Sequence, residues 1–184
     1  AHILLGNLYL ALHIRTKDSQ WLHENQKHIT HLLRQHPNST PVLKLAFDYH
    51  ILQEALSDAS HMLSRIQKTT GMDTNQLALS EAMLKFKQDS QKGYRALLAI
   101  KQPRLTHSYF HHKAHMEHTL MLYETLESTS ANWSKQFSES AIPIFFLASS
   151  YIWNGKLTEA LHAFQRYYEQ TGDQTTLENI AISQ

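Results

Sequence analysis

The stretch LASSYIWNGKLTEALHAFQRYYEQTGD, residues 147–173, decides the fold. Two amphipathic segments flank the tripeptide Asn-Gly-Lys, in which Gly155 suits the C-terminus of a helix, and Thr158 could cap the segment that follows. Ala148 and Ala160 are small enough for two antiparallel helices to approach closely. Large side chains would fill the space around this contact: Tyr151, Phe164 and Tyr167. The stretch therefore predicts an α-helical hairpin.

This hairpin resembles the tetratricopeptide repeat (TPR), a helix pair of about 34 residues. The TPR motif places small residues at about positions 8 and 20 of the repeat, and large residues at about positions 4, 7, 11, 24 and 27. The residues that match at this spacing are Ile144, Leu147, Ala148, Tyr151, Gly155, Ala160, Phe164 and Tyr167.

Small residues recur at intervals of 34 before this stretch, at Ser80, Ala46 and Ala114. A further segment around Gly6 lies 40 residues before Ala46, which predicts a first pair with a longer connection between its helices. In the second and third pairs the second small residue comes one place late, at Ala59 and Gly93, which predicts longer turns.

The fourth pair departs most from the motif. Lys113 and Glu117 stand where core residues are expected, and ESTSANWSKQF, residues 127–137, predicts only a poor second helix.

The predicted fold is all-α: a right-handed superhelix of about five TPR-like antiparallel helix pairs with a C-terminal capping helix. One domain, 1–184, would hold units at 1–38, 39–72, 73–105, 106–140 and 141–173, and a capping helix at 174–184. The tail has Leu177, Ile180 and Ala181 at helical spacing, and repeat arrays need a terminal helix over their last exposed face. The alternative is an irregular all-α domain.

Composition excludes several classes of function. The chain has no cysteine, which excludes disulfides, Cys-ligated zinc and thiol catalysis. A formal net charge of +1 gives no electrostatic footprint for nucleic acid, and no apolar run is long enough to cross a bilayer. Because the chain begins at Ala1 without a signal-like segment, we interpret it as a soluble piece of a longer protein, cytoplasmic or periplasmic.

The TPR resemblance implies a concave, ligand-facing groove formed by the first helix of each pair. The candidate groove residues are Leu43, Phe47, His50, Leu77, Glu81, Leu84, His111, His115, His118, Phe145 and Ile152. Such a groove would be mainly apolar and would suit an amphipathic helix or an extended hydrophobic segment. It lacks the Lys/Asn clamp by which chaperone-binding relatives hold a terminal carboxylate, which argues against a cochaperone role.

Three interpretations of the histidine stripe in HSYFHHKAHMEH, residues 107–118, stay open. The side chains could be solvated surface histidines, or a pH-responsive part of the groove, because neighbouring imidazoles repel one another when protonated. They could also form a metal site of His111, His115 and His118, although Glu117 would point away from it.

No sequence motif indicates catalysis or a cofactor: a P-loop, an HExxH zinc motif and a nucleophile elbow are all absent. The predicted function is a non-catalytic scaffold for a protein or peptide partner, and a homodimer is possible. The alternative is a sensory or regulatory domain of a larger bacterial regulator or secretion-related protein, pH- or metal-responsive through the stripe. The Gln-, His- and Thr-rich composition favours a bacterial source.

Overall fold

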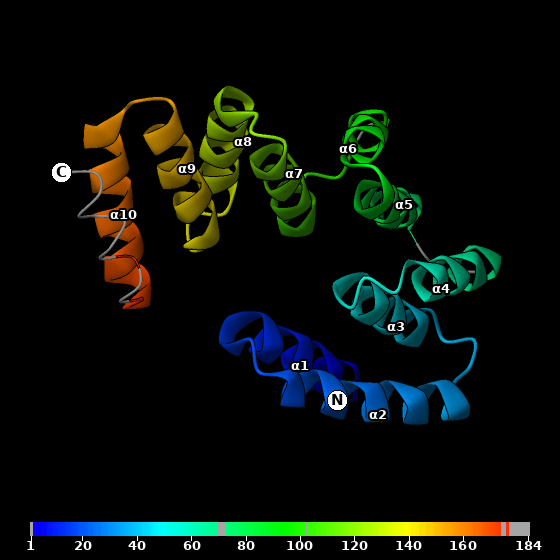
Figure 1. Ribbon diagram of the computed structural model, residues 1–184. Helices are drawn as coiled ribbons and strands as arrows, with labels where there is room; N and C mark the ends of the chain where they lie inside the picture. Colours follow the sequence, from blue (N-terminus) through cyan, green and yellow to red (C-terminus); the bar gives the residue numbers. More distant parts are fainter. Residues whose placement is uncertain (1, 70–72, 102, 174–175, 177–184) are drawn as a thin grey trace. The chain divides into compact units, whose positions relative to one another are not determined.

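The computed structural model describes residues 2–69, 73–101, 103–173 and 176, and every regular element in these residues is an α-helix (Figure 1). The all-α prediction is confirmed. The helices are α1 (His2–Thr16), α2 (Ser19–Gln35), α3 (Thr40–Leu52), α4 (Leu56–Lys68), α5 (Thr74–Gln88), α6 (Ser90–Leu98), α7 (His107–Thr119), α8 (Tyr123–Gln136), α9 (Ile142–Trp153) and α10 (Leu157–Thr171). The expected capping helix, with Leu177, Ile180 and Ala181, lies outside the described residues.

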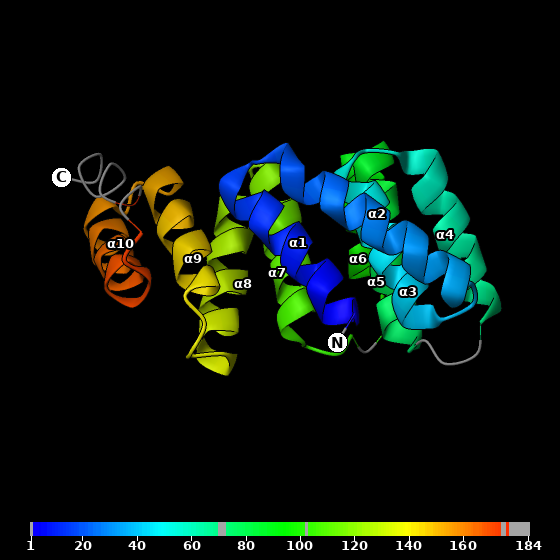
Figure 2. The same ribbon diagram turned by 90° about the horizontal axis from the view of Figure 1, so that it is seen from below.

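The chain divides into two compact units, 1–100 and 101–184. In unit 1 the helices pair in sequence order, α1 with α2, α3 with α4 and α5 with α6, and α3 also contacts α1 and α2. In unit 2, α7 pairs with α8 and α9 with α10, and α9 also contacts α7 and α8. Figure 2 shows α7, α8 and α9 side by side within unit 2. Each unit thus consists of consecutive antiparallel helix pairs.

In three of the pairs, the two helices are joined by the same type of three-residue turn. Its middle residue has a positive φ: 57° at Glu54, 58° at Met121 and 73° at Gly155. The residue after each of these donates its amide to the carbonyl five positions earlier, at 3.0, 2.9 and 2.8 Å respectively. This pattern is the Schellman motif, which satisfies carbonyl groups left free at a helix C-terminus. The Asn-Gly-Lys turn predicted from sequence is one instance of it.

The small residues of the first helices are buried where the 34-residue register predicts a close contact. Ala46, Ala114 and Ala148 are fully buried, and Ser80 is 1% exposed. In α1 the corresponding Gly6 packs on Leu45 of α3, where an added Cβ would overlap the leucine side chain. A second register runs through the second helices, with spacings of 34, 34, 33 and 34 residues, and all of its members are buried: Asn25, Ala59, Gly93, Leu126 and Ala160.

Three expectations about the helix pairs are wrong, two about their connections and one about a helix. Only residues 17–18 separate α1 from α2, so the first pair has longer helices rather than a longer connection. The α3–α4 turn has three residues, like those of the fourth and fifth pairs, and the α5–α6 connection is Asp89 alone. The segment 127–137 lies almost entirely in a regular helix, α8, because tertiary packing of Leu126 and Trp133 outweighs the weak helix propensity of its Ser, Thr and Asn residues.

The two units have separate apolar cores. The core of unit 1 includes Leu43, Phe47 and Leu63 from α3 and α4. Unit 2 has one cluster around Phe110 and Trp133 and another around Ala148 and Phe164.

The fourth pair carries a charged group inside. Glu117 of α7 is fully buried, and its Oε1 lies 3.3 Å from Nζ of Lys113. Lys113 also donates a hydrogen bond of 2.8 Å to Oγ1 of Thr129 in α8. Two residues that break the motif therefore pair with each other.

Candidate functional site

Three of the candidate groove residues in unit 1 belong to its core. Leu43 and Phe47 are fully buried and Leu84 is 7% exposed. The expectation that these side chains face a ligand is wrong. The helix α3, which carries Leu43 and Phe47, is covered by α1, α2 and α4, and α5, which carries Leu84, packs between α4 and α6. A helix enclosed on several sides buries apolar residues all round. His50, Leu77 and Glu81 are partly exposed, and Glu81 accepts a 2.9 Å hydrogen bond from Gln67.

A hollow of about 310 Å³ lies elsewhere on the first helices of unit 1, where α1, α3 and α5 meet. Its walls combine apolar, amide and charged side chains: Ile3, Asn7, Thr40, Pro41, Lys44, Leu45, Asp48 and Gln76. Nζ of Lys44 lies 2.5 and 2.6 Å from the two carboxylate oxygens of Asp48. Among the residues that the structure describes, no hydrogen bond engages the side-chain amides of Asn7 or Gln76. The hollow therefore offers free amide groups beside an internal ion pair.

Sequence reasoning missed this hollow because its residues on α3 are not those assigned to the groove; Lys44 and Asp48, for example, each fall one place after an assigned position. A signal was present in the sequence. Lys44 and Asp48 are charged residues four apart within a mainly apolar helix, TPVLKLAFDYHIL. Such a pair is expected on a surface, since isolated charges are rarely buried.

The histidine stripe of α7 packs against aromatic side chains of α8 and α9. The ring of His111 lies 6.0 Å from that of Trp133 and 6.2 Å from that of Phe146, both edge-on. The ring of His118 also meets Phe146 at 6.2 Å. At the start of α7, Nε2 of His107 lies 2.9 Å from Oγ of Ser140. The stripe thus forms part of the seam between the fourth and fifth pairs, while His115 is exposed.

This packing removes the metal interpretation of the stripe. Within the described residues, no three His, Asp or Glu side chains are arranged so that they could hold a metal ion. The expected site of His111, His115 and His118 is therefore wrong: two of its imidazoles are directed to aromatic neighbours.

Two histidines have a lowered pKa. Burial lowers the pKa of the His111 imidazole, and the nearby imidazoles of His115 and His107 lower it further. Burial also lowers the pKa of His50, although the carboxylate of Asp58, 4.0 Å away, acts in the opposite direction. Both imidazoles are therefore neutral at pH 7.

Unit 2 exposes several apolar side chains. Phe145, at the candidate groove position of α9, is 37% exposed and contacts the ring of Tyr167 at 5.5 Å. Ile152 is partly exposed. Trp153 is 64% exposed and stacks on Tyr123 with ring centroids 5.1 Å apart. All the candidate groove residues in unit 2 thus reach the surface at least in part: His111, His115, His118, Phe145 and Ile152.

The arrangement of helix pairs matches solved structures of TPR proteins. TTC0263, a thermophilic TPR protein of Thermus thermophilus, has a TM-score of 0.71 and 12% identity, over 97% of this chain and 98% of that one. For YrrB, a TPR protein with an unusual peptide-binding site, the TM-score is 0.57 at 13% identity, over 95% and 87%. For PilW, a type IV pilus biogenesis factor, it is 0.64 at 11% identity, over 91% and 78%. The fold is the TPR fold.

At this level of identity the likeness concerns the fold. No protein-family model matches the chain, and no curated protein matches it in sequence. None of the helices in the described TPR pairs combines the length and the apolar character that crossing a bilayer requires.

Proposed function

We propose that the chain is a non-enzymatic scaffold that binds an extended segment of another protein along its first helices. The observation that carries this proposal is the hollow between α1, α3 and α5, since three successive first helices contribute to it. A peptide-binding site on another protein of this fold, YrrB, is consistent with such a role.

The walls of the hollow define the ligand. The free amides of Asn7 and Gln76 can each donate to a peptide carbonyl and accept from a peptide N–H, as an extended backbone requires. Ile3 and Pro41 offer apolar contact, and the Lys44–Asp48 pair presents both signs of charge. The ligand that fits is therefore an extended segment with mixed side chains rather than a wholly apolar helix.

Unit 2, taken by itself, has a surface of different character that could bind a protein segment. His115, Phe145 and Ile152 reach its surface from α7 and α9. Aromatic side chains often supply much of the binding energy at protein interfaces, which favours Phe145 as an anchor.

Capture of partners from the native cell extract tests the proposal. The bait proteins are the unmodified chain, the double variant Asn7→Ala/Gln76→Ala, and the variant Gln91→Ala, which removes an exposed amide on α6. We expect the double variant to lose the partners that the unmodified chain and the control retain. The idea would be abandoned if the double variant, folded to the same extent, captured the same proteins in the same amounts.

A further inference from the structure

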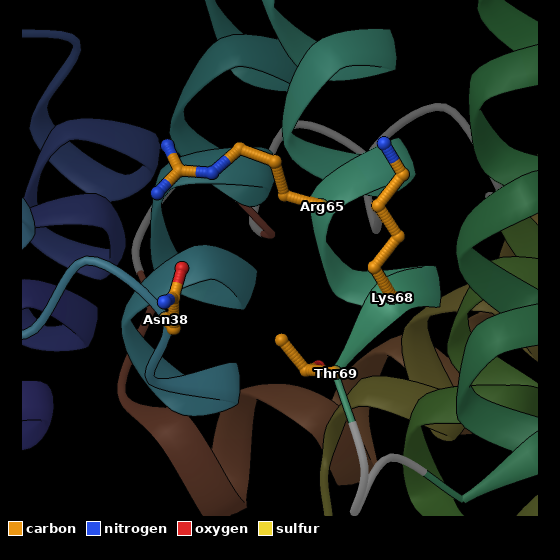
Figure 3. A pocket seen from close by; sticks show the side chains of 4 residues that line it. All are labelled: Asn38, Arg65, Lys68 and Thr69. Atoms are coloured by element: carbon orange, nitrogen blue, oxygen red, sulfur yellow. The ribbon is translucent and has the colours of Figure 1, made fainter.

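A second hollow in unit 1 lies where α4 ends. It shares no lining residue with the first, although the hydroxyl of Thr69 on its wall lies 3.0 Å from that of Thr40 in the first. It has a volume of about 440 Å³ and is lined by Asn38, Arg65, Lys68 and Thr69 (Figure 3). Asn38 belongs to the connection between α2 and α3, Arg65 and Lys68 to the last turn of α4, and Thr69 follows that helix. In Figure 3 the guanidinium of Arg65 extends over Asn38, while Lys68 and Thr69 stand on the other side.

Two of the side chains that line this hollow, Arg65 and Lys68, are positively charged, and none is acidic. No Asp or Glu occurs between residues 25 and 47 or between residues 59 and 72. Neither of the acids nearest in sequence to Arg65 and Lys68, which are Asp58 and Asp73, lines the hollow. Two full positive charges therefore remain uncompensated by the residues that line the hollow.

The donors differ in how firmly they are held. Arg65 donates through Nη2 to the carbonyl of Pro37, which fixes the guanidinium and leaves its other N–H groups available. The hydroxyl of Thr69 donates its hydrogen to the carbonyl of Ile66 at 2.8 Å. Thr69 therefore lines the hollow but has no hydrogen left to donate to a ligand. Across the described part of the chain, no hydrogen bond or ion pair occupies Lys68 or the amide of Asn38.

We propose that this hollow binds a phosphate monoester group, with Arg65, Lys68 and Asn38 as its ligands. A guanidinium donates through a planar fork, while a flexible ammonium supplies a point charge that can follow the oxygens, and both are used to bind phosphate. A dianion would match the two positive charges, whereas a single carboxylate would leave one of them unbalanced. The volume is larger than a bare phosphate ion fills and lies within the range of about 300–1,000 Å³ typical of small-molecule sites.

Titration of the isotope-labelled protein with phenyl phosphate, followed by amide NMR at constant ionic strength near pH 7.5, tests this assignment. We expect saturable shifts centred on the amides of residues 38 and 65–69. The variant Lys68→Ala should weaken binding by about tenfold, the loss expected for one charged hydrogen bond. Inorganic phosphate should compete for the same amides, and acetate should not.

The choice of variants separates loss of binding from loss of folding. Because Arg65 also holds the α2–α3 connection, Arg65→Ala could lower stability, so the test relies on Lys68→Ala and Asn38→Ala. Lys92→Ala, which removes an exposed lysine on α6, should bind as the unmodified protein does. Shifts that do not saturate, equal affinity in Lys68→Ala, or equally strong binding of acetate would each overturn the proposal. None of these outcomes bears on the peptide hollow, which shares no residue with this one.

Discussion

The ammonium of Lys113 lies 3.3 Å from the carboxylate of Glu117, and Glu117 is fully enclosed within the fourth helix pair. Both residues stand at positions that the TPR motif gives to large apolar side chains. Desolvation of a buried charge is costly, so the pair can persist only because each partner compensates the other. Removing one charge should therefore be far more damaging than removing both.

Replacement of Lys113 by Met should lower the free energy of unfolding by about 3 kcal/mol, because it leaves the Glu117 carboxylate buried without its cation. The double variant Lys113→Leu/Glu117→Met restores an apolar core and should come within about 1 kcal/mol of the unmodified protein. Urea unfolding followed by circular dichroism measures both values. A double variant less stable than the single one would show that the pair is not the reason for the loss.

Replacement of Asn25 by Ala should raise the free energy of unfolding by about 1 kcal/mol. Asn25 occupies the position held by Ala59 and Ala160 in other pairs, and among the described residues neither side-chain atom of its amide finds a hydrogen-bond partner. The same substitution at the exposed Asn132 of α8 controls for helix propensity. If both variants gained equally in thermal unfolding, the buried amide would not be the cause.

Leu43 and Phe145 hold equivalent motif positions but should differ in their response to truncation. Leu43→Ala should lower the free energy of unfolding by about 2–5 kcal/mol, because it opens a cavity in the core of unit 1. Phe145→Ala removes more carbon atoms than Leu43→Ala does. It should nevertheless lower the free energy of unfolding by less, since the Phe145 side chain is already 37% exposed. Denaturant unfolding compares the two, and a larger loss at Phe145 would contradict the burial described above.

Stability should decrease as the pH falls below about 6.5, the ordinary pKa of an unfolded histidine. The folded-state pKa values of His50 and His111 lie below that value. Between the folded and unfolded pKa values the unfolded chain binds protons that the folded chain does not, so acid favours unfolding. Urea unfolding at about pH 7.5, 6.5 and 5.5 measures the slope, and the variant His50→Gln/His111→Gln should flatten it. An unchanged slope would assign the effect to other groups.

The fold could be predicted from the sequence because small residues at helix crossings leave a periodic signal. Ala46, Ser80, Ala114 and Ala148 are buried because two backbones approach there, and that requirement repeats in every pair. The helix α8 was missed because its stability comes from packing of Leu126 and Trp133, which local propensity does not report.

The candidate site could be predicted only in part. A motif position says which way a side chain points, but exposure depends on how many helices cover it, and three helices cover α3. In the same way, the aromatic partners of the histidine stripe come from α8 and α9, so Trp133 and Phe146 could not be assigned to it from the spacing within α7.

The recurrent turn with a left-handed middle residue makes the connections interchangeable. Gln53-Glu54-Ala55, Leu120-Met121-Leu122 and Asn154-Gly155-Lys156 share no residue at any place, yet they trace the same backbone path. Chimaeras that exchange these tripeptides should keep the helices on either side unchanged. These loops are therefore natural points for grafting labels or foreign epitopes.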